Sequence, residues 1–149
     1  MITAQPLSIV KFIVELHIDK SIFMNKENPK EVFKNCGTCS QTFAHILNRE
    51  FGHVKEEEER ALAPLAGGII NQGHQCGMLW GATLAIGEEA FQRHNDRSEA
   101  IAVSVTATQH IVESFVNRTN TLNCKEIIGY DLNSVTGMVS FMLKTMVKG

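Results

Sequence analysis

The chain has 149 residues, of which 44% are hydrophobic and 20% are charged, as is typical of a folded globular domain. This composition excludes a disordered chain, and a domain of this length buries enough surface to fold without disulfides or metals. Fourteen Lys and Arg against sixteen Asp and Glu give a net charge of −2, and the absence of a basic cluster argues against nucleic acid as the main partner.

No targeting or membrane-spanning segment is predicted. Residues 1–6 lack the basic region of a signal peptide, and charged residues interrupt the apolar stretch that follows. The longest apolar run, from Cys76 to Gly87, is shorter than the roughly twenty residues that cross a bilayer. We therefore expect no membrane partner and a reducing cytoplasm, where the four cysteines are reactive thiols or metal ligands rather than structural disulfides.

Two helices are predicted in the first third of the chain. The first begins at Pro6, ends within residues 25–29, and has apolar residues at helical spacing: Ile9, Phe12, Ile13 and Leu16. The second follows the capping box Thr38-Cys39-Ser40-Gln41, in which the threonine hydroxyl accepts an N–H and the glutamine reaches back. Gly52 fits the position after this helix, whose predicted core face carries Phe43, Ile46, Leu47 and Phe51. Cys39 is therefore expected at the helix start, on the core side.

The middle of the chain predicts a charged helix start and then a buried helix. The run Lys-Glu-Glu-Glu-Glu-Arg over residues 55–60 is typical of a solvated first turn. The segment from Gly73 to Ala90 is apolar on all sides, which predicts a central, buried helix. Within it, Gly77, Gly81 and Ala85 form a stripe of small residues. Since each glycine costs about 1 kcal/mol of helix propensity, the stripe indicates close approach by another helix or, alternatively, by a cofactor or second subunit.

The last third predicts one long helix and two short elements. Ser98 can cap a helix whose apolar face carries Ile101, Val105, Thr108, Val112 and Phe115. Alternation over residues 103–106 leaves a strand as the alternative there, although the length favours a helix. A turn over 124–129 and a helix over about 133–147 complete the chain. We predict an all-α fold, a single domain over residues 1–149 with about five to seven helices.

Cys36 and Cys39 form a CxxC pair. Two thiols at this spacing can close a disulfide or bind one metal ion from one side. At a helix N-terminus the partial positive charge stabilises a thiolate, which is expected to lower the pKa of Cys39 and make it nucleophilic. The residue directly after Cys39 is Ser40 and not histidine, so the CxxCH motif for covalent haem attachment is absent.

Four segments together resemble a known family. They are Gly37-Thr38-Cys39-Ser40-Gln41, the glycine-rich stretch 67–77 that ends in Cys76-Gly77, the pair Gly81-Ala82, and Cys124 followed by Gly129-Tyr130-Asp131. Over about residues 35–132 the chain resembles the C_GCAxxG_C_C family of bacterial and archaeal proteins, named for its cysteine pattern. This resemblance implies a helical domain with a thiol-based redox role. The chain departs from the family pattern by lacking its last cysteine and by adding Cys36.

Three functions remain open for the cysteines. In the favoured one, Cys39 reacts with an unidentified redox partner and Cys36, Cys76 or Cys124 completes a disulfide. In the second, Cys36, Cys39, Cys76 and Cys124, with His74 in reserve, bind zinc or an iron–sulfur cluster. In the third, buried cysteines act as small hydrophobic residues in a non-catalytic assembly module.

The remaining motifs add little to these alternatives. Serine hydrolase, nucleotide-binding and zinc-protease motifs are absent, so any enzymatic activity is expected to be that of an oxidoreductase. His45 lies on a different face of its helix from Cys39 and is expected to be solvated. Trp80 is expected to fill the core; if it is exposed, Trp80 with Met78 would mark a dimer contact or a pocket for a flat ligand, and we expect a homodimer.

Overall fold

The computed structural model describes the backbone of residues 28–148 and the side chains of residues 28–144. These residues form helices and no strand: α2 (Pro29–Cys36), α3 (Cys39–Glu50), α4 (Glu56–Ala61), the 3-10 turn η2 (Ala63–Leu65), α5 (Gly77–Arg93), α6 (Arg97–Thr119), α7 (Cys124–Ile128) and α8 (Val135–Lys148). The predicted all-α single-domain class is confirmed. The helix predicted from Pro6 lies outside the described residues.

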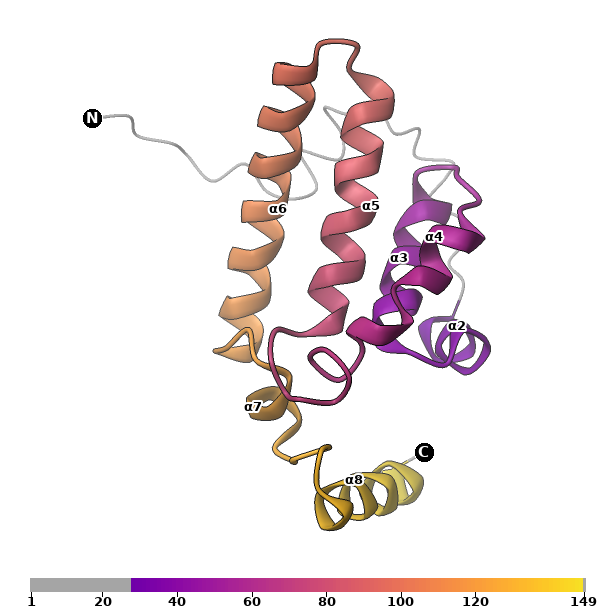
Figure 1. The fold of residues 1–149 in the computed structure, drawn as a ribbon, viewed down its shortest axis with the longest axis vertical. Coiled ribbons are helices and arrows are strands. Elements are labelled where there is room, and N and C mark those ends of the chain that lie inside the picture. The colour runs from indigo at the N-terminus through magenta and orange to yellow at the C-terminus, as the bar shows by residue number, and fades with distance from the viewer. Residues whose placement is uncertain (1–27, 149) are drawn as a thin grey trace, which may run out of the picture.

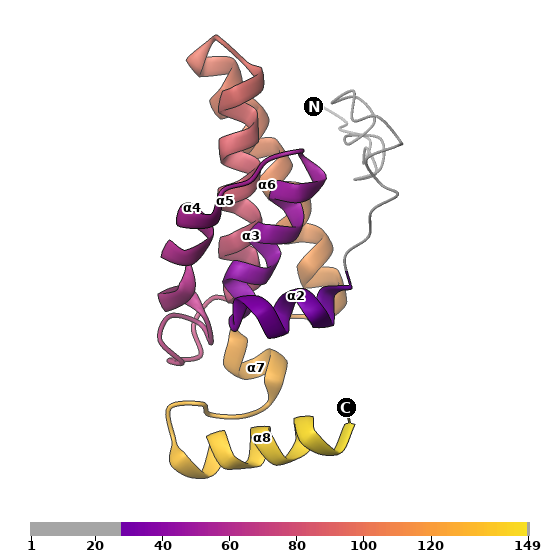
Figure 2. The same cartoon turned by 90° about the vertical axis from the view of Figure 1, so that its right-hand side faces the viewer.

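Helix α5 is the centre of the bundle, with its two main neighbours, α3 and α6, on different sides (Figure 1). Helices α2 and α4 pack against α3. Figure 2 shows α8 crossing the end of the molecule beyond α7, opposite the turn between α5 and α6. The starts of α3, α5 and α7 therefore lie toward the same end of the molecule.

Local sequence signals set the ends of α3 as predicted. The Thr38 hydroxyl accepts the Gln41 N–H at 3.4 Å, and the Gln41 side chain accepts the Thr38 hydroxyl at 2.7 Å instead of reaching the backbone. After α3, Gly52 has a φ of +83°, and the N–H groups of Gly52 and His53 return to the carbonyls of Arg49 and Asn48. This is the Schellman end that glycine permits.

The sequence analysis missed α2, although its start carries a clear signal. The Asn28 side chain accepts the Lys30 N–H at 3.0 Å, and proline occupies the first helical position. Asparagine followed by proline is a favoured way to begin a helix. The segment 25–29, expected only to end a helix, therefore also contains the start of the next one.

Close approach of α3 explains the small-residue stripe of α5. An ideal Cβ on Gly81 would lie 2.1 Å from the Ser40 carbonyl oxygen of α3. Ala44, on the facing side of α3, is buried. The helix-packing interpretation is thus confirmed. The helix itself begins at Gly77 rather than near Gly73, so Cys76 is its N-cap and does not lie inside an apolar helix.

The predicted core faces of α3 and α6 are wrong in part. On α3 the buried residues are small or polar, whereas Phe43 is exposed. On α6, which is capped by Asp96 rather than Ser98, Ala100 and Ala107 are buried, whereas Ile101 and Val105 are exposed. The strand alternative over 103–106 is also wrong. Small residues occupy the helix–helix contacts because they let helices approach closely, and the larger apolar residues remain on the surface.

Candidate functional site

Three of the four cysteines stand at helix starts. Cys39 is the first residue of α3, Cys76 is the N-cap of α5, and Cys124 is the first residue of α7. In α3 and α5 the backbone N–H groups and the partial positive charge of the helix end face these positions, which favours a thiolate.

A short antiparallel pairing joins Cys76 to Cys124 across a long sequence separation. Gln75 bridges with Asn123, the Cys76 N–H donates to the Leu122 carbonyl at 2.8 Å, and the Cys124 N–H donates to the His74 carbonyl at 2.7 Å. Side chains two positions apart on such a ladder share a face. Cys76 and Cys124 therefore lie diagonally on one face, where the two side chains can meet.

The side chain of Cys39, on α3, also lies close to Cys76, at the start of α5. An ideal Cβ on Gly77 would lie 3.0 Å from the Cys39 Sγ and 2.8 Å from the Leu65 carbonyl oxygen. The sulfur of Cys39 thus packs over the backbone of the residue that follows Cys76. Because glycine carries no side chain here, the thiol of Cys39 can approach the start of α5.

Electrostatic interactions link the three thiols. Burial raises the pKa of Cys76, and the charge of Cys39 adds to the rise, while the N–H groups of Met78 and Leu79 offset part of it. Burial, with smaller contributions from Cys76 and Cys39, raises the pKa of Cys124 to about 11. Cys76 and Cys124 are buried and Cys39 is partly exposed. The cluster therefore presents one accessible thiol and two that are protonated at neutral pH.

A left-handed turn precedes Cys76 and was not predicted. Residues 67–71 all have positive φ, including +63° at Ile69 and +44° at Ile70. For residues with a side chain this conformation costs roughly 1–2 kcal/mol each, and strain of this kind is concentrated at functional sites. In Figure 1 the segment coils at the foot of α5, near α7. The glycines at 67, 68 and 73 were the signal available in the sequence.

The turn holds the segment that carries Cys76. An ideal Cβ on Gly68 would lie 2.4 Å from both the N and the O atom of His74, and the His74 N–H donates to the Gly68 carbonyl at 3.1 Å. Gly68 therefore has no room for a side chain. The turn fixes the backbone of His74, whose carbonyl in turn accepts the Cys124 N–H.

The other two predicted site residues are placed differently. Cys36 is the last residue of α2 and is partly exposed. His74 is exposed on the glycine-rich segment and takes part through its backbone. Within residues 28–144, no group of three or more His, Cys, Asp or Glu side chains is arranged to hold a metal ion.

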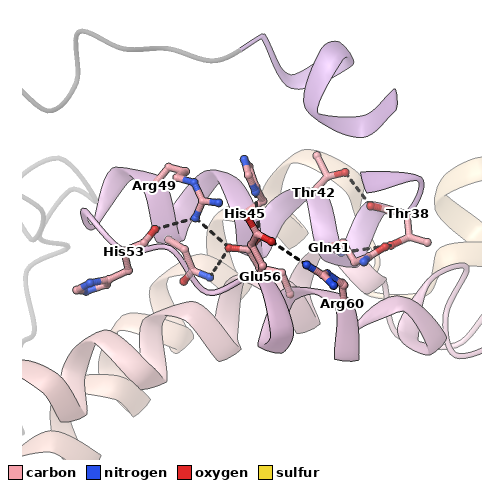
Figure 3. A network of polar contacts seen from close by, with 10 residues as sticks. Thr38, Gln41, Thr42, His45, Arg49, His53, Glu56 and Arg60 are labelled. Carbon is pink, nitrogen blue, oxygen red and sulfur yellow. Dashed lines mark hydrogen bonds and ion pairs between the residues drawn. The ribbon is translucent and has the colours of Figure 1, made fainter. Parts of the chain in front are cut away.

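A second polar cluster, which was not predicted, surrounds Glu59 of α4. Figure 3 shows two of its members on α3, His45 and Arg49. The Glu59 carboxylate is buried and accepts from Asn48 at 3.0 Å, contacts His45 Nδ1 at 2.9 Å and pairs with Arg49 at 3.3 Å. Contrary to expectation, His45 is half-buried. Within the run 55–60, Glu59 is buried, whereas Glu56, Glu57, Glu58 and Arg60 are exposed as expected. The cluster fixes α4 against α3.

A similar arrangement joins α5 to the end of α3. The buried Glu89 carboxylate pairs with His53 at 2.5 Å and with Arg93. Arg49 donates to the His53 carbonyl at 2.8 Å, which connects this arrangement to the Glu59 cluster. The partners of Glu59 lie on α3, whereas Glu89 pairs with His53 in the connection between α3 and α4 and with Arg93 on α5 itself. The role of both carboxylates is to hold α3, α4 and α5 together.

Replacing Glu59 by glutamine should lower the free energy of unfolding at pH 7 by about 2 kcal/mol, since the substitution removes hydrogen bonds to a buried charge. Burial alone would raise the pKa of Glu59, but Asn48, His45 and Arg49 together lower it. The stabilisation is therefore complete above the ordinary glutamate pKa and is lost as the pH falls through the lowered one.

Urea unfolding at pH 7 and at pH 3 measures this effect. Below about pH 4.5 the stability of Glu59→Gln should fall less steeply than that of the wild type. Glu56→Gln is the matched control, because Glu56 is on the same helix but is exposed and pairs only with Arg60 among the contacts described. Equal losses in the two variants would contradict the role assigned to Glu59.

None of the helices described over residues 28–148 is long and apolar enough to cross a membrane. The family model described as "Putative redox-active protein (C_GCAxxG_C_C)" matches residues 37–145, which include Cys39, Cys76 and Cys124. No curated protein and no solved structure matches the chain. Since the match extends over most of its length, the chain belongs to the C_GCAxxG_C_C family.

Proposed function

We propose that the protein is a thiol–disulfide redox protein in which Cys39 reacts with the partner and Cys76 completes the disulfide. The observation that carries this proposal is the packing of the Cys39 sulfur over Gly77, next to Cys76, at the start of α5. A resolving thiol must lie close to the attacking one, and this contact supports Cys76 in that role.

The exposure and protonation of the thiols support the order of events. Cys39 is the accessible member of the cluster, whereas Cys76 is buried and its pKa is raised. A buried, protonated thiol reacts slowly with an external disulfide but can react with a mixed disulfide held beside it. The N–H groups of Met78 and Leu79 favour the thiolate of Cys76 as it forms.

The proposed exchange with a partner disulfide, R–S–S–R, balances in two steps. The Cys39 thiolate attacks one sulfur, the S–S bond breaks, a Cys39–S–S–R bond forms, and one thiolate leaves and is protonated. Cys76 then gives up its proton and attacks the Cys39 sulfur, which forms the Cys39–Cys76 disulfide and releases the second R–SH. The protein loses two electrons and two protons, and the partner disulfide becomes two thiols.

Cys124 and Cys36 have secondary roles in this proposal. Cys124 lies diagonally across from Cys76 and interacts electrostatically with it, so it is a second disulfide partner for Cys76. Cys36 shares the CxxC motif with Cys39 and is the competing partner for Cys39. Both thiols remain reduced in the first oxidised state.

Equilibration with buffers of reduced and oxidised dithiothreitol tests the proposed function. Alkylation of the remaining thiols followed by mass spectrometry should show four thiols in the reduced protein and two after oxidation, in one two-electron transition. Cys36→Ser should retain the transition, and Cys39→Ser should stay reduced at the dithiothreitol ratios that oxidise the wild type, although Cys76 and Cys124 remain. Four thiols at every ratio would contradict the proposal and favour the assembly module. A bound metal ion that protects Cys76 from alkylation would contradict it in favour of the metal alternative.

The remaining expectations extend this proposal. A reducing cytoplasm would keep the cluster in the thiol form between reactions. The redox partner would carry an accessible disulfide, because the partly exposed Cys39 must reach the S–S bond that it attacks. Homodimer formation also stays a proposal, and it does not depend on the thiol chemistry.

A further inference from the structure

Helix α5 carries an apolar stripe on the surface of the bundle. Trp80, Leu84 and Phe91 are all exposed, between 36% and 49% of their full accessibility. They lie four and seven residues apart, with Gly87 between the last two. This spacing, alternating between four and three residues, is that of a helix face that packs against other helices. An ideal Cβ on Gly87 would meet no atom within 4 Å, so the centre of the stripe is open.

Helix α6 carries a second stripe with the same spacing. Ile101 and Val105 are 43% and 60% exposed, and Thr108 and Val112 continue the stripe along the helix. Neither stripe contains a charged residue. This is unusual for solvent-facing positions and is typical of the central part of a protein interface.

The two stripes lie on the same side of the α5–α6 hairpin. On α5, Ile86 and Ala90 are buried on the side away from α3, and on α6, Ala100 and Ala107 are buried against α5. Successive residues of a helix are rotated by about 100° about its axis. On each helix the stripe therefore points roughly 110–120° away from the direction of the residues buried between α5 and α6. Because α5 and α6 are antiparallel, the rotation from the buried residues to the stripe is clockwise on one helix and anticlockwise on the other. Both stripes therefore project from the same face of the α5–α6 hairpin. From Trp80 to Val105, the bulky side chains of both stripes remain between 36% and 60% exposed, so no described element covers that side of the hairpin.

We propose that this hairpin face is the contact between two copies of the chain. Helix α5 has 17 residues and is about 25 Å long, and two adjacent helices present a face roughly 20 Å wide. Each copy would then bury about 500 Å², and the pair about 1,000 Å², which reaches the lower limit for a specific interface. An uncharged apolar face is complementary to itself about a two-fold axis, whereas it offers no charge that would select a different protein.

The assembly is a four-helix arrangement of two hairpins. The bulky residues of one α5 pack on the other hairpin, and Gly87 leaves space for a large side chain from the partner copy. The centre of this contact, around Gly87, lies about three turns along α5 from Cys76, although Trp80 is only about one turn away from Cys76. The dimer does not rest on the proposed redox function.

Sedimentation equilibrium of the full chain in excess reductant tests the proposal. The reductant removes intermolecular disulfides, so the measured mass does not depend on whether the proposed redox function is correct. The wild type should sediment with twice the 16.5 kDa mass of one chain. Leu84→Glu and Val105→Glu should each weaken dimerisation by about 100-fold while preserving the helical circular dichroism spectrum, because both side chains are exposed in one copy.

Two further variants make the test specific. Val54→Glu is the matched control, because Val54 is 70% exposed and lies between α3 and α4, so this variant should remain a dimer. Val139→Glu changes an exposed residue of α8 and should also remain a dimer. A monomeric wild type would overturn the proposal, since the face would then be covered by another segment or another protein. A dimer that only Val139→Glu dissociates would also overturn it.

Discussion

Replacing Gly81 by alanine is expected to lower the free energy of unfolding by about 2 kcal/mol or more. The added Cβ would lie 2.1 Å from the Ser40 carbonyl oxygen and 3.0 Å from the Ala44 nitrogen, both in the backbone of α3. Neither atom can move without shifting the helix. Overpacking typically costs about 1–3 kcal/mol and occasionally more, and a contact this short with backbone atoms is expected at about 3 kcal/mol or above. Subtracting the gain of about 1 kcal/mol in helix propensity leaves the net loss of about 2 kcal/mol or more.

Gly87→Ala is the matched control, because Gly87 is in the same helix and has open space at its Cβ within one copy of the chain. In the monomer this variant should gain about 1 kcal/mol from helix propensity alone. Because Gly87 lies in the proposed dimer contact, urea denaturation of both variants is measured at a protein concentration low enough for the chain to be monomeric. If Gly81→Ala were as stable as Gly87→Ala, the close contact between α3 and α5 would be wrong.

Replacing Cys39 by serine in a Cys36→Ser background, which leaves only the buried Cys76 and Cys124, is expected to slow the reaction of the native protein with oxidised glutathione by at least about 100-fold. The reason is that Cys76 and Cys124 are buried and their pKa values are raised. A thiol with a pKa of about 11 is ionised in only about one molecule in ten thousand at pH 7, and the thiolate is the reactive form.

Cys36→Ser separates the two possible nucleophiles of the CxxC motif. Cys36 lies at the end of α2 and is also partly exposed, so its own reactivity must be measured. The rate of mixed-disulfide formation, followed by mass spectrometry, should be within a few-fold of the wild type in Cys36→Ser. A large loss in this variant, with normal reactivity in Cys39→Ser, would assign the attack to Cys36 instead.

Local signals in the sequence predicted the helices well but their faces less well. Thr38, Gln41 and Gly52 act on neighbouring backbone groups, so the start and end of α3 followed from a few residues. The apolar period around Phe43 could not show which face is buried, because α3 also has a face of small residues. Apolar periodicity identifies a helix that packs against something, and it does not distinguish the core from an interface.

The candidate site was predicted in its residues but not in its arrangement. The position of Cys39 at a helix start followed from the capping box, whereas the meeting of Cys76 with Cys124 depends on a pairing between residues 75 and 123. Long-range pairing of this kind leaves no local signal. The left-handed turn was also hidden, since isoleucine strongly disfavours the conformation that Ile69 and Ile70 adopt. Glu59 differs from the neighbouring glutamates only in facing α3.

Peptide mapping of the oxidised protein under non-reducing conditions tests the central claim most directly. Trypsin cleaves after Lys34 and Arg49, so Cys36 and Cys39 share the peptide 35–49, while Cys76 lies in 61–93 and Cys124 in 119–125. The account predicts that one-step oxidation links peptide 35–49 to peptide 61–93 through Cys39 and Cys76. A disulfide within peptide 35–49, between Cys36 and Cys39, would contradict it.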